Sequence, residues 1–282
     1  MENKRFLIII GQPKAGTTSL YKWLSQHPEI EKSIVKETRF FLDKNYPLPR
    51  SSEYNSKNLS EYFNFFHDKQ KKVYLESTPD YLYCNTALHI KSLLPNAKII
   101  ALHREPVART VSSFNFYKQL GNLSNDLSFE TYVEEQFSLQ DLSELLEYRV
   151  IEQNKYEKYI TPFRKVFLDD LIEIKFEELK TNPEAVLKDI YKEIGIQDNF
   201  KLKDFRVENK TMQAKNIFLS RLYYVVRAQV LYILKPKGMF KRYLSILSKS
   251  LRGLIEQDLK LDSISINDSL RVRIQKDSMR SD

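Results

Sequence analysis

The sequence is poor in several residue types that specialised protein classes require. Cysteine occurs once in 282 residues, at Cys84, which excludes an intramolecular disulfide and a cysteine-rich zinc site. The four histidines show no metal-ligand spacing such as HExxH, so no metal site is expected. No uninterrupted apolar run reaches the roughly 18 residues of a membrane-spanning helix. The closest window, 217–234, contains Arg221 and Arg227.

No secretory signal is expected, because the short apolar run 6–10 leads directly into Gly11. The expected location is therefore the cytoplasm. With 42% hydrophobic and 29% charged residues, the composition is that of a soluble globular protein. We expect a single domain over residues 1–282, since this length supports one large core.

Positive charge is concentrated in one part of the chain. The net charge is +8, but residues 201–250 alone contain 12 Lys or Arg against 2 Asp or Glu. Such a region could meet nucleic acid, an anionic membrane surface or an acidic polymer, or be a solvated helix face. Its segment 217–247 has the pattern of a basic amphipathic helix or helix pair, which leaves open peripheral membrane contact or packing on the core. The polar tail 251–282 is expected to be loose or to pack on a partner.

Glycine is also scarce, with 6 residues, and two of them flank one short loop. The segment 11–18 reads GQPKAGTT; it follows an apolar β-branched run and precedes the helical pattern of 17–24. This predicts a strand, a glycine-containing loop and a helix. Backbone N–H groups and the positive end of the helix dipole then converge at one point, which suits a phosphate or sulfate.

Further apolar runs predict the rest of the fold. Buried strands are expected at 73–76, 98–102 and 171–175, and amphipathic helices at 127–165 and 183–195. The polar segment 43–62 is expected to pass over the sheet edge. Short strands alternating with helices indicate an α/β fold with a central, mostly parallel sheet. Together with the loop, they predict a three-layer architecture like that of phosphate-loop proteins.

The loop departs from the phosphate-loop pattern GxxxxGK[ST] at one decisive position. Thr17 stands where the lysine is usual, and Lys14 lies inside the loop instead. No apolar strand ends in an aspartate that would hold Mg²⁺, so ATP or GTP hydrolysis is poorly supported. The strand 98–102 leads instead to Arg104, with Ser112 on the following helical pattern. An arginine at a strand's carboxyl end suggests a second phosphate site.

Five blocks in this order resemble one family, the sulfotransferases that use 3′-phosphoadenosine 5′-phosphosulfate (PAPS), particularly the carbohydrate, heparan-sulfate-like branch and its bacterial relatives. The resemblance covers roughly residues 5–196. Its blocks are the loop 11–20, the segment KETRFF at 36–41, the segment ESTPDY at 76–81, the pattern Arg104, Pro106, Arg109 and Ser112, and the segment 172–179 leading to a helix and Gly195.

The resemblance implies a role for individual residues. The loop would bind the 5′-phosphosulfate of PAPS, with Lys14 on the bridging oxygen and Gly16, Thr17 and Thr18 as donors. Arg104 and Ser112 match the 3′-phosphate ligands, and Glu37 matches the catalytic base of the carbohydrate branch. The implied donor-binding set is Lys14, Ala15, Gly16, Thr17, Thr18, Ser19, Arg104 and Ser112, and the product left in the site would be adenosine 3′,5′-bisphosphate (PAP).

General chemistry agrees with two of these roles. Sulfuryl transfer to a hydroxyl requires removal of a proton of high pKa, which a carboxylate such as Glu37 can accept. A desolvated lysine such as Lys14 stabilises the charge that develops on the leaving phosphate. Arg39 departs from the family, whose carbohydrate branch often has histidine at that position, and would favour a more anionic acceptor or pair with a carboxylate.

Other residues near these blocks keep two interpretations. Glu37 could be only an ion-pair partner of Lys36 and Arg39. Glu76 and Asp80 could orient substrate or cap a helix. His103 is expected to pack at a strand end. Lys210 and Lys215 are candidates for a C-terminal segment that closes over the donor.

The resulting hypothesis is a metal-independent enzyme that moves the sulfuryl group of PAPS to a saccharide hydroxyl by in-line attack. Acceptors of another kind stay open, such as a lipid, a small alcohol or a tyrosine, and an amine acceptor is not excluded. The alternatives from other classes are an ATP-dependent phosphate-loop kinase and a module that binds nucleic acid or an anionic membrane. The expected partners are PAPS and a carbohydrate, with no nucleic acid; the sequence does not indicate an oligomeric state.

Overall fold

The computed structural model describes residues 4–50, 54, 59–124, 126–139, 145–200, 202, 205, 212–214, 256–258 and 264–280. Nearly all of the basic region 201–250 lies outside these residues, as do Lys210 and Lys215. The chain forms two compact units. One comprises Met1–Arg109, Ile151–Glu208 and Arg273–Asp282, and the other comprises Thr110–Val150 and Asn209–Val272.

The first unit is built on a five-stranded sheet. Its strands are β1 (Arg5–Gly11), β2 (Ile30–Lys32), β3 (Val73–Ser77), β4 (Ala97–His103) and β5 (Leu171–Lys175). They lie in the order β2-β3-β1-β4-β5, and every neighbouring pair is parallel. The predicted α/β class with a parallel central sheet is confirmed.

The central strand β1 is buried on both faces, as its apolar run requires. It pairs with β3 in the register Leu7↔Leu75 and with β4 in the register Leu7↔Lys98. Leu7 and Ile9 belong to a core that includes Leu20 and Leu24 of the first helix. Phe6 packs instead against aromatic rings around Phe63 and Tyr74. Successive residues therefore serve opposite faces of the sheet.

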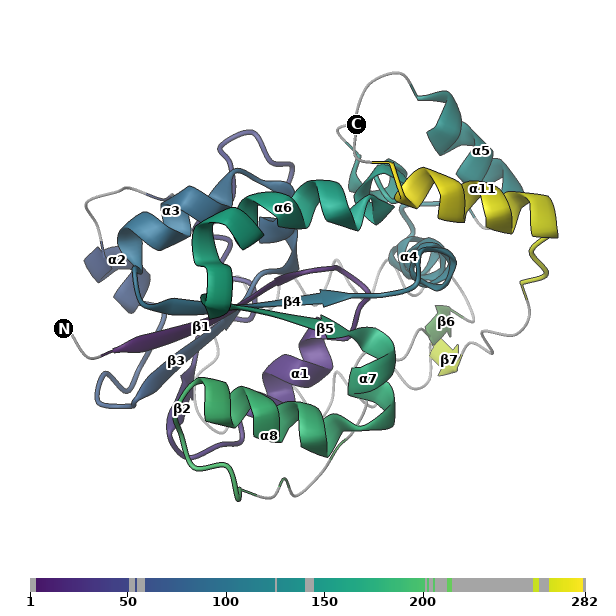
Figure 1. Ribbon diagram of the computed structural model, residues 1–282. Helices are drawn as coiled ribbons and strands as arrows, with labels where there is room; N and C mark the ends of the chain where they lie inside the picture. Colours follow the sequence, from purple (N-terminus) through teal and green to yellow (C-terminus); the bar gives the residue numbers. More distant parts are fainter. Residues whose placement is uncertain are drawn as a thin grey trace. The chain divides into compact units, whose positions relative to one another are not determined.

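Helices cover both faces of this sheet and give it three layers (Figure 1). Helices α1 (Thr17–Leu24), α7 (Phe176–Thr181) and α8 (Pro183–Glu193) lie on one face. Helices α3 (Thr86–Leu93) and α6 (Tyr156–Phe167) lie on the other and contact each other. The short helix α2 (Leu59–Phe63) overlaps the end of the segment 43–62, which was predicted to pass over the sheet edge.

The second unit contains most of α4 (Pro106–Leu120), which continues from the first unit, and all of α5 (Phe129–Ser138). Its strands β6 (Met212–Ala214) and β7 (Glu256–Asp258) form an antiparallel pair. In the polar tail, residues 268–278 form α11 (Asp268–Ser278), whose Leu270 and Ile274 are buried. No helix in the described parts of the chain is long and apolar enough to span a membrane.

The structure departs from the sequence prediction in two elements. The segment 127–165 is not helical throughout: after α5, the described residues form 3₁₀ turns at Leu146–Tyr148 and Glu152–Asn154 before α6 begins at Tyr156. The turn at Glu152–Asn154 buries Gln153 and Asn154 in polar contacts of the first unit, and these contacts outweigh helical periodicity. Strand β2 was not predicted, because only one of its three residues, Ile30, is apolar.

Candidate active site at the carboxyl ends of the central strands

The direction in which strands are added to the sheet changes at β1. Strand β3 flanks β1 on one side and β4 on the other, so the loops that follow these strands diverge at their carboxyl ends. Ligands of open α/β sheets bind at such a switch point. The loop 11–16 follows β1 here, and its backbone is fixed by Ala15 N–H donating to Gln12 O at 3.1 Å.

Glycine is required at both ends of this loop. A Cβ at Gly11 would lie 2.7 Å from Cδ2 of Leu82, closer than side chains pack. Gly16 caps α1 with a φ of 89°, in the left-handed region that favours glycine. These constraints turn the backbone sharply into α1, whose positive dipole end then faces the loop.

Lys14 lies inside the loop in an environment that disfavours its charge. Burial, together with the positive charges of Arg104 and Lys36, lowers the pKa of Lys14 to about 8. The backbone at Lys14 also has a positive φ of 69°. A cation held in this way is stabilised when an anion binds beside it.

Arg104 reaches the same loop from the end of β4. Its Nη1 donates to the carbonyl of Lys14 at 3.1 Å, and its guanidinium lies 4.4 Å from the ring centroid of Phe176. Its Nε is buried without a hydrogen-bond partner among the described residues. A buried guanidinium N–H that lacks a partner is a ready donor to an anionic ligand.

Side chains of the loop and of α4 are hydrogen-bonded to the turn at Glu152–Asn154. Gln12 Nε2 donates to the carbonyl of Gln153 at 3.0 Å. Arg109, only 1% exposed, donates through Nε to Asn154 Oδ1 at 2.7 Å. Neither Gln153 nor Asn154 belongs to a sequence motif, so neither could be selected from the sequence.

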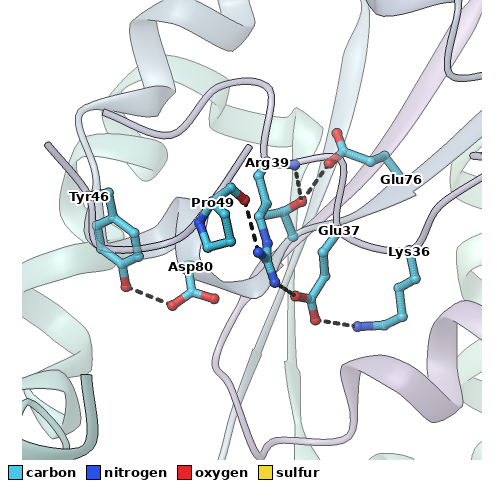
Figure 2. A network of polar contacts seen from close by, with 8 residues as sticks. Lys36, Glu37, Arg39, Tyr46, Pro49, Glu76 and Asp80 are labelled. Atoms are coloured by element: carbon cyan, nitrogen blue, oxygen red, sulfur yellow. Dashed lines mark hydrogen bonds and ion pairs between the residues drawn. The ribbon is translucent and has the colours of Figure 1, made fainter. Parts of the chain in front are cut away.

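Glu37 lies between two cations on the loop that follows β2. Lys36 Nζ contacts Oε1 of Glu37 at 3.0 Å, and Arg39 Nη2 contacts Oε2 at 3.2 Å (Figure 2). Arg39 also donates to the carbonyl of Pro49 at 2.9 Å. The carboxylate is about a third exposed, with 30% of its side-chain surface accessible. The ion-pair partnership expected from the sequence is present, and it joins Glu37 to Lys36, whose charge acts on Lys14.

A second carboxyl group belongs to the same polar cluster. Asp80 accepts a hydrogen bond from Tyr46 Oη at 2.6 Å (Figure 2). Burial raises the pKa of Asp80 to about 6; the Tyr46 hydrogen bond opposes this shift, and the charge of Glu37 adds to it. The sequence suggested Asp80 as a substrate-orienting or capping residue and gave no sign of its pairing with Tyr46.

The structure thus brings Lys14, Arg104, Lys36 and Glu37 to one edge of the sheet in the first unit. Ala15, Gly16, Thr17, Thr18 and Ser19 follow on the loop and the first turn of α1. Ser112 is buried on α4 in the second unit, and its role as a phosphate ligand stays a prediction. His103 stacks on Tyr156 with ring centroids 4.6 Å apart, consistent with a packed residue at a strand end.

Comparison with known protein families assigns the chain to a class. The family model described as "Sulfotransferase domain" matches residues 4–218, which is most of the chain. The protein therefore belongs to the sulfotransferase family, and the family resemblance found in the sequence is confirmed.

Individual relatives of the chain are also named as sulfotransferases. The chain is 36% identical over 110 residues to the membrane-associated sulfotransferase kil1 of Dictyostelium discoideum, covering 39% of this chain and 22% of that protein. It is 27% identical over 195 residues to heparan sulfate glucosamine 3-O-sulfotransferase 3B1 of Mus musculus, covering 67% of this chain and 46% of that protein. The chain thus spans less than half the length of these curated relatives.

The fold is likewise that of a solved sulfotransferase. The structure of a sulfotransferase from Alicyclobacillus acidocaldarius superposes with a TM-score of 0.60 at 23% sequence identity. The match covers 83% of this chain and 96% of that one. This likeness establishes the three-layer, phosphate-loop-like fold.

Proposed function

We propose that the protein transfers the sulfuryl group of PAPS to a hydroxyl group of a saccharide. The observation that carries the proposal is the pair of half-buried cations, Lys14 and Arg104, that meet at the glycine-bounded loop beside the carboxylate of Glu37. Family membership supports the reaction class. The names of relatives that act on heparan sulfate support a carbohydrate acceptor.

The residues present fit a donor with more than one anionic group. The loop supplies a helix N-terminus and the Lys14 ammonium group, and Arg104 supplies a buried N–H that has no hydrogen-bond partner in the described part of the chain. Thr17, Thr18 and Ser19 add hydroxyl groups in the first turn of α1. In the proposed assignment, Arg104 and Ser112 hold the 3′-phosphate, and the loop from Lys14 to Ser19 holds the 5′ end.

When bound, PAPS supplies an activated sulfuryl group. Lys14 stabilises negative charge at the phosphate end of the breaking bond, where a desolvated ammonium group contributes most. Glu37 accepts the proton of the attacking hydroxyl, and its two cationic neighbours hold its carboxylate in one orientation. Lys14 and Arg104 supply the positive charge for in-line transfer, so the proposed mechanism assigns no step to a metal.

Calorimetric titration with PAP in the absence of metal tests the donor site. We expect Lys14→Ala and Arg104→Ala each to weaken binding by about tenfold or more, since each removes a charge-assisted contact. Lys91→Ala is a matched control, because Lys91 pairs with Asp170, which precedes β5 at the opposite edge of the sheet. Equal binding of ATP with Mg²⁺, or PAP binding insensitive to both site variants, would overturn the assignment.

Transfer of radiolabelled sulfate from PAPS to a heparan-type polysaccharide tests the base and the acceptor class. Glu37→Gln is expected to retain PAP binding and to lose about 100-fold or more in turnover. Full activity in this variant contradicts the role of Glu37. Wild-type transfer to p-nitrophenol but not to the polysaccharide would remove the carbohydrate acceptor and leave the donor site intact.

A further inference from the structure

Glu76 is a fully buried carboxylate surrounded by hydroxyl groups. It lies on β3 with no exposed surface. Its Oε1 receives Thr38 Oγ1 at 2.6 Å, Thr78 Oγ1 at 2.7 Å and Tyr81 Oη at 2.9 Å. Its Oε2 receives Tyr62 Oη at 2.7 Å. Hydrogen bonds to an acceptor-only group fix the direction in which each hydroxyl proton points.

Three of these hydroxyl groups also accept hydrogen bonds from the backbone of the loop that carries Glu37. Their lone pairs accept from three successive backbone N–H groups, those of residues 39, 40 and 41. Arg39 N–H donates to Thr78 Oγ1 at 3.2 Å, and Phe40 N–H donates to Thr38 Oγ1 at 3.3 Å. Phe41 N–H donates to Tyr81 Oη at 3.2 Å. One carboxylate therefore orients the acceptors of three consecutive amides, and such chains of hydrogen bonds strengthen one another.

The backbone held in this way is strained. Glu37 has a φ of 67° and Arg39 a φ of 58°, both in the left-handed region. Such residues cost on the order of 1–3 kcal/mol each and persist only where their surroundings fix them. The loop is anchored by Glu37 N–H donating to the carbonyl of Ser77 at 3.0 Å and by the buried rings of Phe40 and Phe41.

We propose that Glu76 is a positioning residue that holds Glu37 in its reactive place by acting on the backbone of residues 39–41 through Thr38, Thr78 and Tyr81. Glu76 contacts the loop through the Thr38 hydroxyl, and Figure 2 draws no interaction between Glu76 and Glu37 itself. The inference rests on the proposed role of Glu37 as base. Glu76 needs no contact with substrate for this role.

A pair of isosteric variants separates positioning from general stability. Thr38→Val removes one of the three hydroxyl groups that join Glu76 to amides of the loop, whereas Tyr62→Phe removes the hydroxyl on Oε2, which contacts no amide of the loop. Each variant deletes one buried hydrogen bond to the same carboxylate. Thr38→Val also deletes the acceptor of the Phe40 N–H, so the comparison uses the amides of Arg39 and Phe41, whose acceptors stay in place in both variants. Thr38→Ser restores the hydroxyl and serves as the rescue variant.

The primary measurement is amide hydrogen exchange of residues 39 and 41, which requires neither PAPS nor an acceptor substrate. We expect Thr38→Val to speed this exchange by about tenfold, because the loop loses one of the hydrogen bonds that Glu76 orients, and Tyr62→Phe to leave it within about twofold. Transfer from PAPS to a heparan-type polysaccharide should fall in kcat by about tenfold in Thr38→Val, with PAP affinity unchanged and recovery in Thr38→Ser.

Equal effects of Thr38→Val and Tyr62→Phe on exchange or on kcat overturn the proposal, because they reduce Glu76 to a structural residue. Faster exchange in Thr38→Val without loss of kcat overturns it as well. Failure of the proposed function is distinguishable, since full activity of Glu37→Gln removes the base while the exchange measurement still reads the link between Glu76 and the loop.

Discussion

Lys14 is held at a pKa that makes donor binding sensitive to pH. In the free protein, burial lowers its pKa to about 8, whereas a bound phosphate beside it favours the charged form and raises the pKa. Below that value the amine is charged before and after binding. Above it, binding must first return a proton to Lys14.

We therefore expect the affinity for PAP to be level near pH 7 and to fall as pH rises through about 8, by at most tenfold per pH unit. Calorimetry in buffers of different ionisation enthalpy measures the accompanying proton uptake. The control is Lys14→Arg, because a guanidinium stays charged throughout this range. The same pH dependence in Lys14→Arg would assign the effect to another group.

Asp80 gives a second pH dependence, which concerns the stability of the fold. Burial raises its pKa from 3.8 to about 6, so between these values the folded state holds a proton that the unfolded state has released. Stability contributed by this group is present below about pH 4 and is lost as pH rises through 6.

Asp80→Asn removes this dependence. Between pH 4 and pH 7, the free energy of unfolding of the variant is expected to rise relative to that of the wild type by on the order of 2 kcal/mol, measured by urea denaturation. In Tyr46→Phe, the pH range over which this stability is lost should extend to higher pH, because the Tyr46 hydrogen bond lowers the pKa of Asp80. A stability difference that is constant with pH would contradict the assignment.

At the scale of elements, the sequence predicted those whose cause is local. Strands β3, β4 and β5 and helix α8 follow from apolar runs and from Pro183 and Gly195 at the helix ends. The interruption between α5 and α6 depends on contacts of Gln153 and Asn154 with residues distant in the chain, which periodicity does not encode.

The candidate site shows the same division. The loop 11–18 could be recognised because glycine spacing and strand-to-helix order are visible in the sequence. The burial of Arg109 and the convergence of hydroxyl groups on Glu76 could not, because they arise from tertiary packing. The left-handed backbone at Glu37 and Arg39 carries no glycine to signal it.

Gly16 tests the junction between the loop and α1. Gly16→Ala places a Cβ 3.1 Å from Phe176 Cδ2 at a φ of 89°, which should cost about 1–2 kcal/mol of stability and weaken PAP binding several-fold. Gly121→Ala is the matched control, since its φ of 76° is similar but it lies in the second unit. Thermal denaturation and PAP titration separate the two effects. Unchanged PAP affinity in Gly16→Ala would show that the loop's turn does not shape the donor site.

At the scale of the whole molecule, the charge distribution separates two kinds of anion binding. The donor site depends on Lys14 and Arg104, whereas the excess of basic residues lies at 201–250. We expect Lys14→Ala to elute from a heparin column at the same salt concentration as the wild type. The variant in which Lys235, Lys237 and Lys241 are changed together to Gln should elute at a lower salt concentration. Equal retention of both variants would locate polyanion binding elsewhere.

The order of strands in space has a further consequence, for the kinetics of folding. Strand β1 pairs directly with β4, although residues 12–96 separate them along the chain, and no tight turn can nucleate a parallel pair. Contacts of such long sequence separation slow folding. Until β3 and β4 arrive, the apolar β1 strand has unpaired edges and is prone to pair with other chains. The strand at the centre of the sheet, which leads into the loop 11–16, is therefore also the segment that we expect to be most exposed to intermolecular pairing during folding.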